Sequence, residues 1–131
     1  MEKDGLDDLF SKAVLENLFP KERTDQFFDA LFGEPSEGAF DISLQFKGYD
    51  REKLLFEFHL KERSGKCLAC NLTSGLPEVF TRHPVINVKG LIQGIDKLLN
   101  GRARCASWQL GYTREISGEL HIIPLAISLK E

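Results

Sequence analysis

Hydrophobic and polar residues alternate most regularly in the first half of the chain. Apolar residues occupy every second position in residues 40–47, 54–61 and 66–73. Successive side chains of a strand point to opposite faces, so each stretch predicts a strand with one apolar face. The turn-forming stretches 48–51 and 62–65 that separate them are short. The pattern therefore predicts a meander of three antiparallel strands.

Two helices are predicted ahead of the meander. Residues 6–19 and 24–32 carry apolar side chains three and four positions apart, which is the spacing of an amphipathic helix. Pro20 is expected to end the first helix because it lacks a backbone donor. Thr24 is expected to cap the second helix, and Gly33 to terminate it.

A third helix is predicted after the meander. Apolar residues recur at helical spacing in residues 88–99, with Asn87 as the expected cap and Gly101 as the expected end. Gly90 and Gly94 lie one turn apart on a flank of this helix. They predict close packing of its backbone against another element.

Two further strands are predicted in the last quarter of the chain. Residues 107–112 alternate, residues 115–118 have turn character, and residues 120–129 form the final apolar segment. The alternation of this segment changes parity beside Pro124. The change predicts either a β-bulge at that point or a strand that is buried on both faces.

The order of these elements predicts an α+β fold. Two helices, three strands, one helix and two strands (ααβββαββ) form a two-layer sandwich, with a mainly antiparallel five-stranded sheet and helices on one face. The length of 131 residues favours a single domain, residues 1–131. Within it, residues 1–33 form a helical hairpin and residues 39–131 form the sheet with one long helix.

Charge is distributed unevenly along the chain. The net charge is −3, yet residues 1–37 hold ten acidic and four basic residues. A solvated acidic helix pair explains this better than a site selected for a charged partner. The sequence pI near 5.7 argues against a nucleic-acid partner, although basic residues are spread over residues 82–104.

The cysteine count and the absence of long apolar segments predict a cytoplasmic protein. Three cysteines are an odd number, which fits a reducing compartment better than a disulfide framework. No apolar run reaches the roughly 20 residues of a membrane span, so no membrane partner is expected. Residues 1–5 lack the pattern of a secretory signal.

Cys67 and Cys70 have the two-residue separation of a metal knuckle or a redox pair. A third ligand could come from Cys105, and a fourth from His83, His59 or His121. Residues three apart on a regular strand point to opposite faces, however, so the strand pattern separates the two thiols. Ordinary packing of small side chains is the favoured interpretation, and a thiol- or metal-dependent protein is the alternative.

Aromatic residues suggest a candidate interaction surface. Its members are Phe19, Phe27 and Phe28 in the N-terminal helices, and Trp108 and Tyr112 near the C-terminus. Core packing explains the phenylalanines more simply, but their number leaves room for a dimer interface. A small-molecule pocket between helix and sheet near Trp108 is a further hypothesis.

In element order and size, the chain resembles the small acidic chaperones of type III secretion. The resemblance covers the chain coarsely and extends to no individual residue. It implies a homodimer that holds an unfolded segment of another protein. Because no motif for catalysis or for a cofactor is present, we expect a non-catalytic cytoplasmic binding or adaptor protein that contacts a protein partner or itself. The alternative is a protein that depends on Cys67, Cys70 and Cys105 as thiols or metal ligands.

Overall fold

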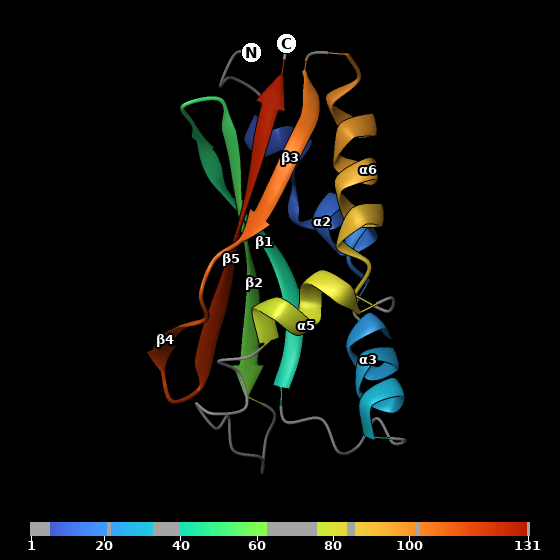
Figure 1. Ribbon diagram of the computed structural model, residues 1–131, viewed down its shortest axis with the longest axis vertical. Helices are drawn as coiled ribbons and strands as arrows, with labels where there is room; N and C mark the ends of the chain where they lie inside the picture. Colours follow the sequence, from blue (N-terminus) through green and yellow to red (C-terminus); the bar gives the residue numbers. More distant parts are fainter. Residues whose placement is uncertain are drawn as a thin grey trace.

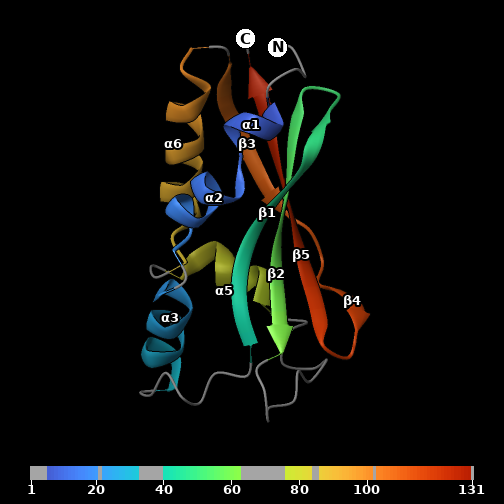
Figure 2. The same cartoon turned by 180° about the vertical axis from the view of Figure 1, so that it is seen from behind.

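The protein is built from a twisted antiparallel sheet with helices along one face (Figure 1, Figure 2). The computed structural model describes residues 6–20, 22–32, 40–62, 76–83, 86–101 and 103–130. The helices are α1 (Leu6–Leu9), α2 (Lys12–Leu18), α3 (Glu22–Phe32), α5 (Leu76–Arg82) and α6 (Val88–Leu99). The strands are β1 (Phe40–Asp50), β2 (Lys53–Glu62), β3 (Arg104–Leu110), β4 (Arg114–Ser117) and β5 (Leu120–Lys130).

The sheet has the order β1-β2-β5-β3, and β4 pairs with β5. All pairs are antiparallel, which confirms the predicted α+β fold with a five-stranded antiparallel sheet. The third strand predicted at residues 66–73 lies outside the described residues. The prediction of a turn at residues 115–118 was wrong, because Arg114, Glu115 and Ser117 pair with β5. The tight turn consists of Gly118 and Glu119.

Aromatic rings on the buried face of β2 join the sheet to the helices. Buried and more exposed residues alternate along β1 and β2, as the sequence pattern predicts. The ring of Phe58 lies 5.5 Å from that of Phe19, which follows α2, and 5.4 Å from that of Phe80 in α5. The ring of Phe56 lies 5.2 Å from that of Phe10, which follows α1. Burial of these rings stabilises the contact between the two layers.

The helix predicted at residues 6–19 is interrupted. α1 ends at Leu9, and Ser11 caps α2 by accepting a hydrogen bond from the N–H of Val14 at 3.4 Å. Serine side chains bond readily to nearby backbone groups, which favours caps over helix interiors. Apolar spacing is the same on both sides of Ser11, so the spacing does not reveal the break.

Thr24 does not have its predicted role as a helix cap. α3 begins at Glu22, and Thr24 lies buried in its first turn. The Thr24 hydroxyl accepts a hydrogen bond from the N–H of Ile42 at 3.1 Å and donates to the Ile42 carbonyl at 3.4 Å. A helix side chain thus bonds to the edge of β1 at the point where another strand would otherwise pair.

α6 begins directly after Asn87, as predicted. At both glycines of this helix, nearby atoms leave little room for a side chain. Oδ1 of Asn87 accepts a hydrogen bond from the N–H of Gly90 at 3.2 Å. A Cβ atom at Gly90 would collide with the Asn87 side chain, and one at Gly94 would lie 2.8 Å from Cδ2 of Leu18. Gly94 therefore permits close packing against α2, as predicted, whereas Gly90 makes room for the cap residue of its own helix.

Pro124 lies in the middle of β5. The β-bulge that was one of the two predictions for this position is absent there. The register between β2 and β5 is unbroken along their contact. The sheet is irregular on the other side of β5, where the chain passes from β3 to β4 and the N–H of Gly111 donates to the Pro124 carbonyl at 2.8 Å. The backbone N and O of a strand residue point to the same side of the strand. Proline has no N–H, and at Pro124 the missing N–H would point to the side of β5 where pairing changes from β3 to β4. Near Ile122 and Ile123, β5 is buried on both faces, which was the second interpretation.

Candidate functional site

The face of the sheet opposite the helices is the first candidate surface. Among the described residues, no helix covers this face (Figure 1, Figure 2). A hollow of about 360 Å³ crosses β2, β5 and β3 on it. Its lining includes the apolar residues Leu55, Pro124 and Ala126 and the polar residues Glu57 and Gln109. The hollow offers an apolar floor with few polar groups, which is the usual chemistry of a binding pocket.

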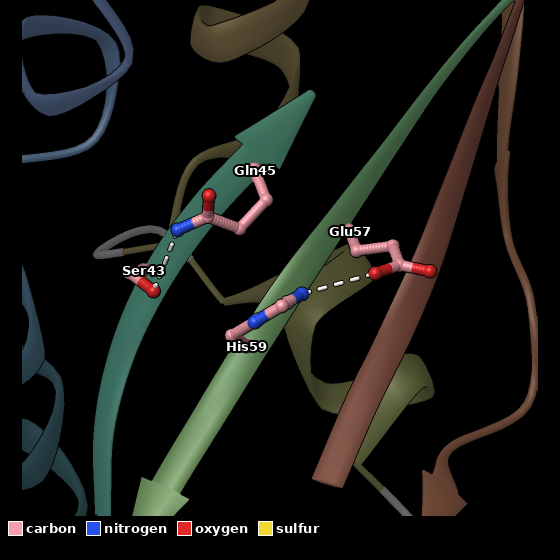
Figure 3. Close-up of polar contacts among 4 residues, drawn as sticks. All are labelled: Ser43, Gln45, Glu57 and His59. Atoms are coloured by element: carbon pink, nitrogen blue, oxygen red, sulfur yellow. Dashed lines mark hydrogen bonds and ion pairs between the residues drawn. The ribbon is translucent and has the colours of Figure 1, made fainter. Parts of the chain in front are cut away.

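Two pairs of polar side chains lie on the same face of the sheet, one at the hollow and one on β1 (Figure 3). Nε2 of His59 lies 3.0 Å from Oε1 of Glu57, and the Glu57 side chain is 15% exposed. On the neighbouring strand, Nε2 of Gln45 donates to Oγ of Ser43 at 3.4 Å. The carboxylate of Glu57 is therefore a largely buried polar group in the lining of the hollow.

Ser43 and His59 are directly opposite each other in the β1–β2 register, which invites comparison with a nucleophile and its base. A serine nucleophile requires a hydrogen bond between its hydroxyl and the base. Figure 3 instead shows Nε2 of His59 directed to Glu57, while the hydroxyl of Ser43 accepts from Gln45. The four side chains form two separate pairs, and this arrangement does not support nucleophilic catalysis.

A second candidate is a groove along the edge of β1, which is the first strand in the sheet order. The groove has a volume of about 710 Å³ and lies between β1 and the stretch from α2 to the start of α3. Leu15 and Phe19 supply buried apolar side chains to its lining. Ile42 and Leu44 line it from β1. The groove thus combines a strand edge with a lining of both apolar and polar side chains.

The predicted thiol and metal residues are distributed as follows. Cys67 and Cys70 lie outside the described residues. Cys105 lies in β3, half-buried, on the face that packs against the helices. His83 follows α5, and its ring lies 4.8 Å from that of Phe27. Within the described part of the chain, no group of three or more His, Cys, Asp or Glu residues is placed to hold a metal ion.

The surroundings of Cys105 disfavour its thiolate. Burial raises the pKa of the Cys105 thiol, and charge repulsion and a hydrogen bond with the nearby Asp96 carboxylate add to the effect, which together bring the pKa to about 11. Asp96 is held in place because its Oδ1 accepts the backbone N–H of Cys105 at 2.9 Å. The thiolate is the reactive form of cysteine, so this position suits packing better than catalysis.

Cys105 is expected to react slowly with alkylating reagents. In a Cys67→Ser, Cys70→Ser background, about one Cys105 in ten thousand would be a thiolate at pH 7, given a pKa of about 11. Asp96→Asn removes the negative charge but keeps an acceptor for the Cys105 N–H, so alkylation should become several-fold faster. The rate of iodoacetamide modification measures both effects. Alkylation of Cys105 as fast as that of free cysteine would contradict this account of the site.

The predicted aromatic surface is divided by the fold. Phe19 and Phe27 are buried in the core, while the side chain of Phe28 lies outside the described residues. Trp108 faces the helices and packs partly buried against the core. Tyr112 is 92% exposed and lies between β3 and β4, directly after Gly111 in the lining of the hollow. Of those residues whose side chains the structure describes, Tyr112 is the one placed fully at the surface.

Comparison of the chain with protein-family models, curated proteins and solved structures yields no match. The candidate sites therefore rest on the geometry of this chain.

Two features of the candidate sites were not predicted from the sequence. The hydrogen bonds between Thr24 and Ile42 join residues from different layers, so no local signal announces them. The contact between Glu57 and His59 joins residues two apart on one strand, and such residues share a face. Alternation alone could have indicated this second contact.

Proposed function

We propose that the protein is a non-catalytic, chaperone-like binding or adaptor protein that acts as a homodimer in the cytoplasm. The observation that carries the proposal is the concentration of exposed apolar groups along one edge of the sheet. Among the described residues, Tyr112 and Ile116 are the large hydrophobic residues with exposed side chains, at 92% and 53%. Both lie on the segment from β3 to β4, and Tyr112 directly follows Gly111, which lines the apolar hollow.

A twofold dimer provides a simple way to cover this surface. In such an interface the same patch is used by both subunits, so a protruding group and a recess must lie on one patch. Tyr112 supplies the protruding group, and the hollow around Pro124 and Ala126 supplies the recess. Tyrosine is favoured at interfaces because it combines a large apolar area with a polar tip.

Other properties of the chain support a protein partner. The net charge of −3 disfavours nucleic acid, whose binding relies on an excess of basic residues. The odd number of cysteines fits the reducing cytoplasm. None of the described helices has the length and apolar character needed to span a membrane. The resemblance in element order to secretion chaperones points in the same direction as the exposed apolar edge.

The dimer is tested by measuring mass in solution with light scattering and sedimentation. We expect twice the chain mass of 14.8 kDa for the wild type. Ala126→Arg places a charge in the hollow, and Tyr112→Ser removes the apolar ring, so each should shift the equilibrium towards monomer by about tenfold or more. Gln93→Arg on the exposed side of α6 is the matched control and should leave the mass unchanged.

Three results would overturn this proposal. A wild-type mass of 14.8 kDa at every concentration would exclude the homodimer. An unchanged dimer in Ala126→Arg would exclude the hollow as its interface. Stoichiometric zinc or iron in the purified protein would instead favour the alternative function based on Cys67, Cys70 and Cys105.

A further inference from the structure

We propose that the groove beside β1 binds a basic, extended polypeptide segment, which adds to the edge of the sheet as a short strand next to Leu44. The inference rests on the proposed binding function and names the chemistry of its partner. It uses a different surface from the dimer contact, because the groove lies at the β1 edge and the dimer patch lies beside β3 and β4.

The orientation of the β1 backbone follows from Thr24. Because the N–H and carbonyl of Ile42 both bond to the Thr24 side chain, both point away from β2. In an antiparallel pair this orientation recurs at every second residue. The N–H and carbonyl of Leu44 therefore also point outward, and Leu44 lines the groove. An extended segment could form the hydrogen bonds there that a neighbouring strand would form.

Thr24 also sets the limit of the open edge. Its hydroxyl occupies the backbone groups of Ile42, so an added strand cannot pair at that residue. Beyond Leu44, the β1–β2 register shifts between Phe46 and Gly48, which interrupts regular pairing. The open edge between Thr24 and this bulge is short, so the occupant is a short extended segment and not a whole domain.

The helix side of the groove combines buried apolar residues with exposed acidic ones. Leu15 of α2 and Phe19 after it line the groove and lie within the hydrophobic core. Side chains of an added strand alternate between the two faces of the sheet. Every second residue of the segment would face this helix side, where Glu16 and Glu22 are exposed, while the residues between them would face the opposite side.

Charge at the groove selects a basic segment. Three exposed acidic residues, Glu16, Glu22 and Asp41, line it together with one basic residue, Lys12. Glu16 and Glu22 come from the helix side of the groove, so the basic side chains of a segment that alternates basic and apolar residues can face these two carboxylates. Complementary charge of this kind favours association and discriminates against acidic partners.

The test uses the full chain and labelled synthetic peptides, with binding followed by fluorescence anisotropy and by amide exchange at Leu44. A short peptide that alternates lysine and valine should bind and slow exchange of the Leu44 N–H. A peptide that alternates glutamate and valine should not bind. Methylation of the backbone nitrogens of the basic peptide keeps its charge but removes its donors, and should abolish binding.

Variants locate the site and separate it from the dimer. Glu16→Lys combined with Glu22→Lys should weaken binding by about tenfold or more, whereas Glu119→Lys, an exposed residue outside the groove, should have no effect. The groove proposal is wrong if the acidic or the methylated peptide binds equally well, or if the two groove reversals leave affinity unchanged. If the wild type is a monomer and still binds the peptide, the dimer proposal is wrong and the groove proposal stands. If the wild type is a dimer that binds no peptide, the groove proposal is wrong and the dimer proposal stands.

Discussion

Replacing Phe58 with alanine is expected to lower the free energy of unfolding by about 3–5 kcal/mol. Phe58 is 0% exposed, and its ring contacts those of Phe19 and Phe80. The truncation removes apolar burial and leaves a cavity between β2, the end of α2 and α5, which rigid neighbouring elements can fill only in part. Urea unfolding monitored by circular dichroism measures the loss.

Two other variants on β2 serve as controls for this prediction. Phe58→Leu keeps much of the apolar volume and should be less damaging than alanine. Lys61→Ala alters an exposed residue of the same strand and should change stability by about 0.5 kcal/mol or less. A cost below about 1 kcal/mol for Phe58→Ala would show that this cluster is not the packed centre of the fold.

Thr24→Val is expected to destabilise the protein by about 1–3 kcal/mol. Valine has a similar shape, but it lacks the hydroxyl that bonds to both backbone groups of Ile42. These groups would then be left beside a buried apolar side chain, and unsatisfied buried polar groups are costly. Thermal or urea unfolding of the variant provides the measurement.

Thr81→Val is the matched control for this substitution. Thr81 also bonds to a backbone carbonyl, that of Pro77 at 2.8 Å, but it does so at an exposed position where water can replace the hydroxyl. Its cost should be about 0.5 kcal/mol or less. Equal costs for the two variants would contradict the role of Thr24 as a buried partner of the β1 edge.

Much of the fold follows from sequence periodicity. The alternation in β1 and β2 and the helical spacing in α6 are strong because one face of each element is buried. The break at Ser11 and the strand β4 were missed because local capping and pairing with β5 decide them, and neither changes the apolar spacing. Of the two interpretations predicted at Pro124, the bulge was wrong, because the irregularity lies in the strands that pair with the other side of β5, and the strand buried on both faces was confirmed.

The candidate sites were much less predictable. Tyr112 was identified as a surface candidate, but the hollow beside it is formed by residues of several strands that are distant in sequence. The β1 groove depends on Thr24, whose local pattern indicates a helix cap. Only the three-dimensional packing of α3 against β1 turns this residue into the end of a binding edge.

Residue-specific amide hydrogen exchange in the free protein tests the account most directly. The N–H of Ser43 should exchange slowly because it points to the side opposite that of Ile42 and pairs with β2. Ile42 should also exchange slowly because its N–H bonds to buried Thr24. The N–H of Leu44 should exchange much faster than both, since it faces the groove. Protection of Leu44 equal to that of Ser43 would mean that the β1 edge is already closed, and would contradict the proposed binding edge.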